Sequence, residues 1–204
     1  MKIRIDVGAN LGTVSLPWLE DQDVVVYAFE PEPAAFGQLL SRSHNHPRYH
    51  CINKAISSVE GLRDFYVSVD PSSSSLLPYT EEGIKKWKCP PQRKHGIKEI
   101  IKVEAVTLYR FLEENNITIV DFLKVDAQGH DLEVIKSAEN KIQNIIDVEF
   151  EVQITDFKLY EWSSSLAESF DYMKKMDFSF IKKEFNTPGQ EINCYFHNNR
   201  YEKQ

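Results

Sequence analysis

The sequence is poor in cysteine: its three cysteines, Cys51, Cys89 and Cys194, are odd in number and far apart. Such cysteines argue against a disulfide framework, and without a Cys-x-x-Cys pair they also argue against a thiolate zinc site. Long apolar runs are absent too, since none approaches the roughly 20 residues that a membrane-spanning helix needs. The first residues contain neither the apolar core nor the cleavage site of a secretory signal. We therefore expect a reduced, intracellular, cytoplasmic protein with no membrane insertion.

Positive charge is also in short supply, because 24 Lys and Arg residues face 31 Asp and Glu residues, which gives a net charge of −7. An acidic surface repels nucleic acid unless cations are concentrated locally. Cations do gather between Lys85 and Lys102, but Trp87 is the only Trp, Tyr or Phe ring in that stretch. The stretch could steer an anionic acceptor, although a solvated surface is the favoured interpretation. We expect no nucleic-acid partner.

Short apolar runs typical of buried strands alternate with amphipathic segments typical of helices. Strands are expected at residues 3–7, 24–29, 49–53, 119–125, 145–152, 178–184 and 192–197. Helices are expected at residues 13–19, 33–43, 107–115 and 131–138, with a last one capped by Ser163. This order predicts an α/β fold in which helices cover a largely parallel sheet and the last two strands form an antiparallel edge. A Pro- and Ser-rich stretch at about residues 70–102 predicts an insertion or lid on a single domain spanning residues 1–204.

The most informative segment is the turn that follows the first strand, Asp6-Val-Gly-Ala-Asn-Leu-Gly12. Gly8 permits a tight turn and a close ligand approach, because a Cβ would obstruct both. Backbone amides at the start of the next helix face the crevice at the strand ends. Glu30 ends the second strand about 20 residues later, where a carboxylate can accept hydrogen bonds from ribose hydroxyls. We expect an adenosine-type cofactor across the carboxyl ends of the strands.

Two phosphate-binding motifs are missing from this turn. The dinucleotide motif Gly-x-Gly-x-x-Gly needs glycine at positions 8, 10 and 13, but the chain has Asn10 and Thr13 at the last two, and it contains no P-loop. A nicotinamide oxidoreductase is therefore disfavoured. An acidic residue before a Gly-rich turn fits S-adenosylmethionine, which carries no phosphate, and Asp6 could orient the turn or meet the methionine ammonium. A glycine turn that binds no ligand is the structural alternative.

Four segments occur in one order along the chain: Asp6–Gly12, Phe29-Glu-Pro-Glu-Pro33, Asn53-Lys-Ala55 and Leu123-Lys-Val-Asp-Ala-Gln-Gly129. Together they resemble the FkbM family of S-adenosylmethionine-dependent methyltransferases, over Ile5 to about Ala138. The resemblance implies the Rossmann-like class I methyltransferase fold: a mostly parallel seven-stranded sheet with an antiparallel C-terminal strand and helices on both faces. It also implies S-adenosylmethionine as the cofactor. Because no helix precedes the first strand, we expect either a trimmed family member or part of a larger polypeptide.

The resemblance assigns the cofactor pocket residue by residue. The residues expected at the methionine end are Gly8, Ala9, Asn10 and Gly12, beside Asp6. Glu30 is expected to hold the ribose hydroxyls, and Pro31 is expected to wall the adenine. Asn53 and Ala55 fall where class I enzymes contact the adenine ring. A solvated strand end is the alternative for Glu30.

Methyl transfer from a sulfonium depends mostly on positioning, but an alcohol acceptor also needs a base or a metal. Asp126 and Gln128 are expected beside the transferable methyl, with Asp126 the first candidate for the base. His130 titrates near neutral pH and Glu151 ends a strand, so both are further catalytic candidates; His130 cannot be carried over from the resemblance, because the family varies there. Glu149 and Glu151 project from the same face of a strand and could bind Mg²⁺ with Asp126, although no fixed ligand spacing supports a metal.

The sequence thus predicts an O-methyltransferase that modifies a hydroxyl, with a sugar of a glycan or glycoside as the first acceptor class. That acceptor follows from the resemblance and from the aromatic segment Phe157, Tyr160 and Trp162, which could form a sugar platform or pack beneath the last helix. Another small-molecule or lipid-like acceptor remains open. The alternatives of another class are a nicotinamide oxidoreductase and a cofactor-binding module without catalysis.

Overall fold

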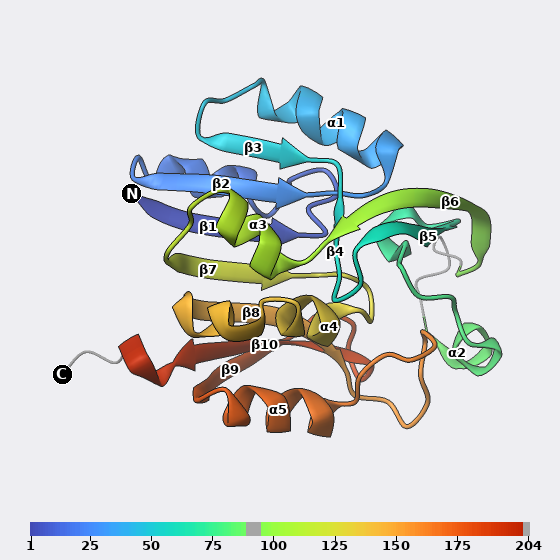
Figure 1. Cartoon of the computed structure of the whole chain (residues 1–204). Coiled ribbons are helices and arrows are strands. Elements are labelled where there is room, and N and C mark those ends of the chain that lie inside the picture. The colour runs from blue at the N-terminus through green and yellow to red at the C-terminus, as the bar shows by residue number, and fades with distance from the viewer. Residues whose placement is uncertain (89–94, 202–204) are drawn as a thin grey trace.

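A computed structural model describes residues 1–88 and 95–201, and its centre is a seven-stranded sheet (Figure 1). The strands, in spatial order, are β3 (Tyr49–Ile52), β2 (Val24–Phe29), β1 (Lys2–Val7), β7 (Val120–Val125), β8 (Ile145–Gln153), β10 (Glu191–Asn198) and β9 (Phe178–Phe185). The first five pair in parallel, whereas β10 runs antiparallel to both β8 and β9. The predicted sheet is confirmed. The antiparallel strand lies inside the sheet, however, because β9 takes the edge and β10 returns between it and β8.

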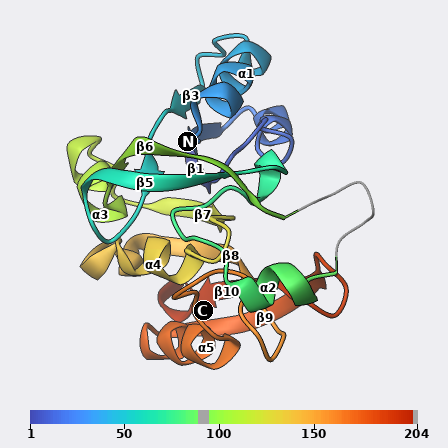
Figure 2. The ribbon, with the colours of Figure 1, turned by 90° about the vertical axis from the view of Figure 1, so that its right-hand side faces the viewer.

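Helices cover both faces of this sheet, as predicted (Figure 2). On one face lie α3 (Leu108–Glu114), α4 (Asp131–Lys136) and α5 (Leu166–Lys175), whose buried side chains join those of the central strands in one core. On the other face, α1 (Pro33–Ser43) and the 3-10 helix η1 (Leu16–Glu20) pack against β2 and β3, where Leu39 meets Val24 and Val26. Among the described residues, no helix is long and apolar enough to span a bilayer.

Side-chain caps define where three of the helices begin. Glu32 accepts backbone hydrogen bonds at the start of α1, with Pro33 as the first helical residue, and Thr107 caps α3. Ser165 and Glu168 form a reciprocal capping box at the start of α5. The prediction that Ser163 caps this helix is wrong: Ser163 is buried and donates its hydroxyl hydrogen bond to the Tyr160 carbonyl at 2.9 Å.

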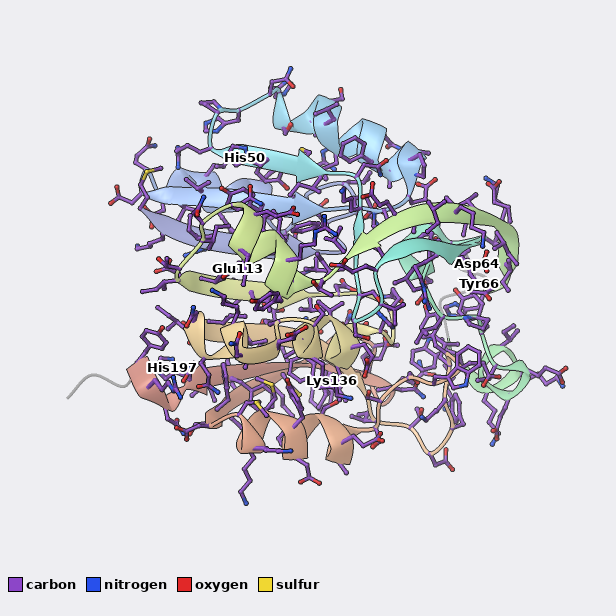
Figure 3. All side chains as sticks on the ribbon, in the orientation of Figure 1. His50, Asp64, Tyr66, Glu113, Lys136 and His197 are labelled. Atoms are coloured by element: carbon purple, nitrogen blue, oxygen red, sulfur yellow. The ribbon has the colours of Figure 1, made fainter. Side chains whose placement is uncertain are left out.

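A second sheet, missed by the sequence analysis, lies beyond the carboxyl ends of the parallel strands (Figure 1). It contains β4 (Ala55–Ile56), β6 (Ile97–Val106) and β5 (Gly61–Ser68) in that order. Asp64 and Tyr66 of β5 lie at this end of the molecule, and His197 of β10 lies at the opposite end (Figure 3). The second sheet therefore covers the edge at which the predicted site residues gather.

The stretch 70–102, predicted to be an insertion or lid, connects β5 to β6. It contains a 3-10 turn at Pro71–Ser73 and α2 (Glu81–Lys86), and from Ile97 onward it belongs to β6. Three residues named in the sequence analysis or in its basic stretch, Cys89, Arg93 and Lys94, lie outside the described residues.

Candidate functional site

Two adjoining cavities open at the edge of the large sheet where β1, β2 and β7 end. Most residues predicted from the sequence for the cofactor or the reaction line the first cavity: Gly8, Asn10, Glu30, Pro31, Ala55, Asp126, Gln128 and His130. The second cavity shares Ser72, Asp126 and Gln128 with the first. The two cavities therefore meet at the residues that directly follow β7.

The glycine turn after β1 is shaped by close backbone packing. Gly8 has φ +78°, and an added Cβ would lie 1.9 Å from the carbonyl oxygen of Asp126, so only glycine fits between the ends of β1 and β7. The amides of Gly8 and Ala9 both donate to the carbonyl of Phe29 at the end of β2, at 3.0 and 2.9 Å. Gly12 has φ +69° and packs beneath α1. Ala9 and Gly12 thus support the turn from behind, outside the cavity lining.

Glu30 is a buried carboxylate that faces the first cavity. Its two oxygens accept backbone hydrogen bonds from Asn10 at 2.8 Å and from Glu32 at 2.9 Å. Burial raises the pKa of Glu30 to about 7, against the effect of these two bonds. Asn53 lies outside the cavity lining and donates from its amide to the carbonyls of Glu30 and Pro31, at 2.8 and 3.2 Å. Asn53 therefore braces the backbone that presents the carboxylate.

Asp6, a residue of β1, is fully buried and lies outside both cavity linings. Asp6 and Lys124 are register partners, and the Lys124 ammonium lies 3.1 Å from Asp6 Oδ1 and 3.7 Å from Asp126 Oδ2. Burial alone would lower the pKa of Lys124, but the charges of Asp6 and Asp126 raise it above its ordinary value. This lysine therefore stays charged and links the glycine turn to the residue that follows β7.

The side-chain amide of Gln128 is held on both sides. Its Nε2 donates to Asp126 Oδ1 at 2.8 Å and to Glu151 Oε2 at 3.3 Å, while its Oε1 accepts from the Tyr160 hydroxyl at 2.9 Å. Tyr160 in turn stacks on Tyr79, with ring centroids 4.9 Å apart. The amide thus joins two carboxylates and fixes the orientation of Asp126 at the meeting point of the cavities.

His130, a predicted catalytic residue, lines the first cavity but not the second. Its Nε2 lies 3.1 Å from the hydroxyl oxygen of Ser57, a buried residue that follows β4. Burial lowers the pKa of His130 to about 4, so the imidazole is neutral at pH 7. Its position beside Ala55 and Ser57 places it at the side of the cavity formed by the second sheet.

The structure does not assemble the possible metal site of Asp126, Glu149 and Glu151. Among residues 1–88 and 95–201, no group of three or more His, Cys, Asp or Glu side chains is placed to hold a metal ion. Glu149 accepts from the Asn193 amide at 3.0 Å, one step back along β8 from the site. Glu151 is buried, and accepts from the amides of Asn186 and Gln128. Both carboxylates are thus engaged by side-chain amides.

Glu191, which the sequence analysis missed, lines the second cavity. It accepts from the Thr187 hydroxyl at 3.0 Å, and its backbone pairs with Gln153 in β8. Burial raises the pKa of Glu191 to about 7, and the negative charge of Asp126 adds to the rise. The signal that could have found it is strand direction: an antiparallel strand begins at the edge where its parallel neighbours end.

The second cavity is lined mostly by polar side chains: Ser72, Ser73, Trp87, Lys88, His95, Asp126, Gln128, Leu159, Asn186, Thr187 and Glu191. The three residues of the possible aromatic platform, Phe157, Tyr160 and Trp162, line neither of the two cavities. Trp162 is 75% exposed and Tyr160 is buried beneath Gln128, while Phe157 packs edge-on against Trp87 at 6.2 Å. Trp87 lines the second cavity instead.

The basic stretch near α2 is largely neutralised within the described residues. Its ion pairs are Lys85–Glu81 at 3.8 Å, Lys86–Glu82 at 2.6 Å, Lys98–Glu99 at 3.4 Å and Lys102–Asp64 at 2.8 Å. These lysines are more than half exposed, as expected for a solvated surface. Lys88 differs, because it lines the second cavity.

Known proteins resemble this chain in sequence. The profile of the methyltransferase FkbM domain matches residues 6–180. Hexuronic acid methyltransferase AglP of Haloferax volcanii is 26% identical over 141 residues, which cover 69% of this chain and 51% of that protein. Methyltransferase sdnD of Sordaria araneosa is 27% identical over 172 residues, which cover 70% of this chain and 64% of that protein. The chain therefore spans less than two thirds of the length of either relative.

Solved structures share the fold at low sequence identity. The structure of M. capricolum TrmK in complex with S-adenosyl-homocysteine matches 97% of this chain and 62% of that one, with a TM-score of 0.54 and 8% identity. The magnesium protoporphyrin IX methyltransferase ChlM from Synechocystis, solved with bound SAM, matches 96% of this chain and 69% of that one, with a TM-score of 0.50 and 8% identity. At such identities the likeness shows the fold alone.

Proposed function

Because the chain belongs to the FkbM methyltransferase domain family, we propose that it is an S-adenosylmethionine-dependent O-methyltransferase whose acceptor is a sugar hydroxyl in a glycan or glycoside. The observation that carries this proposal is the meeting of two cavities at Asp126 and Gln128. One cavity offers a buried carboxylate suited to a ribose, and the other offers a polar lining suited to a polyhydroxylated acceptor.

The chemistry of the first cavity fits the adenosine end of the cofactor. Each oxygen of Glu30 accepts one backbone hydrogen bond and has a further lone pair for a ribose hydroxyl. Pro31 and Ala55 supply apolar surface to the same cavity. Once bound, the cofactor supplies an electrophilic methyl group on a sulfonium. The role of this chain's residues is then to orient the acceptor oxygen and remove its proton.

The lining of the second cavity supports a sugar over a lipid. Its hydroxyl, amide and carboxylate groups can pair with several acceptor hydroxyls, whereas a lipid chain would leave them unpaired at a cost of about 1–3 kcal/mol each. Trp87 adds a flat apolar ring against which the C–H face of a sugar can pack. The activity named for the Haloferax volcanii relative, methylation of a hexuronic acid, supports the same class of acceptor.

The cofactor is tested first by thermal unfolding with S-adenosylhomocysteine and, separately, with NADH. A ligand at 100 times its Kd stabilises the folded state by about 2.7 kcal/mol, which is roughly 5–10 °C for a chain of this size. We expect a shift with S-adenosylhomocysteine and none with NADH. A shift with NADH alone would contradict the methyltransferase assignment and favour the oxidoreductase alternative.

The acceptor is tested by incubating the protein with S-adenosylmethionine and methyl glycosides of glucose, galactose, mannose, glucuronic acid and galacturonic acid. We expect mass spectrometry to detect one added methyl group on at least one of them, with an equal amount of S-adenosylhomocysteine. Cofactor binding without transfer to any of these sugars would contradict the sugar acceptor. Transfer to a fatty alcohol instead would favour the lipid-like alternative.

A further inference from the structure

We propose that Glu191, in place of Asp126, is the general base that removes the proton from the acceptor hydroxyl; this inference rests on the function proposed above. Glu191 is the first residue of β10, the strand that runs antiparallel to its neighbours. Its side chain therefore reaches the edge where β7 ends, and it lines the second cavity together with Asp126 and Gln128. Of these three residues, only Glu191 does not also line the first cavity.

Both carboxylate oxygens of Asp126 are already in contact with other side chains. The Lys124 ammonium lies 3.7 Å from its Oδ2, and the Gln128 amide donates to its Oδ1 at 2.8 Å. These two contacts hold the Asp126 carboxylate in one orientation. Asp126 can still accept a hydrogen bond from the acceptor and orient it, because its side chain is 37% exposed.

Two other carboxylates near the site are already used by the protein. Asp131 is buried and accepts from the backbone amides of Ala127 and Gly129, at 3.2 and 3.0 Å, and it lines neither of the two cavities. Glu151 is buried and is engaged by the amides of Asn186 and Gln128. These two side chains hold the loop after β7 and the β9–β10 hairpin in place.

Glu191 has a different environment. Its carboxylate accepts one hydrogen bond from a side chain, that of Thr187 at 3.0 Å, and no Lys, Arg or His is paired with it among the ion pairs of the described residues. The carboxylates of Asp126, which follows β7, and of Glu151, on β8, interact electrostatically with Glu191, and so does Tyr160. Lys88 and His95 line the same cavity from the β5–β6 connection.

These surroundings make Glu191 a base of suitable strength. Burial first, and then the charge of Asp126, raise the pKa of Glu191 to about 7. A general base works best when its pKa lies near the operating pH, since it is then both ionised and strong enough to take a proton. Burial and the charges of Asp126 and Glu191 raise the pKa of Glu151 as well, so the two glutamates titrate together.

The proposed step is balanced without a metal or a redox partner. The acceptor oxygen forms its bond to the methyl carbon as the carbon–sulfur bond breaks, with that electron pair remaining on sulfur. The acceptor proton moves to a carboxylate oxygen of Glu191. The neutral carboxylic acid then loses this proton to solvent, and the enzyme returns to its starting charge.

The test replaces Glu191 by Gln and by Asp, with Glu184→Gln as the matched control. Glu184 is on β9, the other strand of the β9–β10 hairpin, and forms an ion pair with Lys182. It lines neither of the two cavities, so its loss should leave transfer unchanged. We expect E191Q to lower kcat by about 10²- to 10⁴-fold, the usual contribution of a general base, and to abolish the rise in rate near pH 7. E191D should restore part of kcat, and all variants should keep the wild-type thermal shift with S-adenosylhomocysteine.

A second measurement does not depend on turnover. In protein labelled with ¹³C at glutamate carboxyl groups and bound to S-adenosylhomocysteine, the signal lost in E191Q should titrate with a pKa near 7. A signal that titrates near the ordinary value of about 4.3 would overturn the proposal, as would an E191Q variant with the wild-type rate and pH profile. If the wild-type protein methylates no sugar, the proposed function itself fails. If wild type and E191Q are equally active, only the assignment of the base fails.

Discussion

The Glu30 carboxylate provides the sharpest test of the cofactor pocket at the scale of one residue. It is 6% exposed, and each oxygen accepts one backbone amide and has capacity for one ribose hydroxyl. Glu30→Ala should therefore weaken binding of S-adenosylhomocysteine by about 1–3 kcal/mol, because it removes the partner of two ligand hydroxyls and leaves two amides unpaired. Isothermal titration calorimetry measures this loss directly.

The matched control is Glu32→Ala, two residues further along. The Glu32 side chain caps α1 by accepting from Ala34 and Ala35, and it lies outside the first cavity. Its loss should reduce the free energy of unfolding by about 0.5–2 kcal/mol but should leave cofactor affinity unchanged. Equal affinity losses in the two variants would contradict a ribose contact by Glu30.

How far single residues could be predicted depends on what positions their side chains. Glu30 and Asp126 follow buried parallel strands, and the ends of such strands meet at one edge whatever the loops do, so the sequence placed both at the cavity. Asn53 and Asp6 depend on their local partners. Asn53 turns toward the carbonyls of Glu30 and Pro31, and Asp6 is drawn into an ion pair across the sheet, which no spacing in the sequence indicates.

At the scale of elements, the contact between the ends of β1 and β7 depends on the absence of a side chain at Gly8. In Gly8→Ala the new Cβ would lie 1.9 Å from the Asp126 carbonyl, at a φ of +78° that L residues rarely adopt. We expect the free energy of unfolding to fall by about 2 kcal/mol or more. Cofactor affinity should fall too, because the displaced backbone carries the cavity wall. Urea denaturation measures the first effect and calorimetry the second.

Gly37→Ala in α1 is the matched control, with the opposite sign. Gly37 is helical and exposed, and an added Cβ would meet no atom within 4 Å. Alanine should increase the free energy of unfolding by about 0.5–1 kcal/mol, because it restricts the unfolded chain. If both substitutions changed stability by the same amount, the close approach of the Gly8 turn to β7 would be wrong.

Elements with strong hydrophobic patterns were predicted well. Strands whose place in a sheet depends on partners far away in the sequence were not. Buried runs such as residues 24–29 identify a central strand by themselves. The second sheet was missed because most residues of β6 are exposed, so charged residues interrupt the apolar run that identifies a buried strand. Glu191 was missed for a related reason, since its position depends on the direction of β10 between two other strands.

At the scale of the whole molecule, the folded state holds several titratable groups in protonation states that the unfolded chain does not share. Burial raises the pKa of Glu30, Asp131 and Glu191 to about 7 and lowers that of His130 to about 4. Above the unfolded carboxyl pKa of about 4, folding then binds protons at the three carboxyls, so stability falls as the pH rises through 7. At His130 the sign is reversed, but that effect is complete above the unfolded histidine pKa of about 6.5.

Between pH 6.5 and 8 the buried carboxyls, with Glu151 coupled to Glu191, outweigh His130, and we expect the protein without ligand to lose about 1–2 kcal/mol of stability over this interval. For a chain of this length that is roughly 2–8 °C in Tm, measurable by calorimetry in buffers of equal ionic strength. E191Q removes one of these carboxyls, so its Tm should fall less steeply with pH. The exposed pair Lys2–Asp21 gives the control, because Asp21→Asn should leave the slope unchanged. A Tm that rises between pH 6.5 and 8 would mean that these carboxyls are ionised in the folded protein well below neutral pH. The raised pKa assigned to Glu191, the proposed base, would then be wrong.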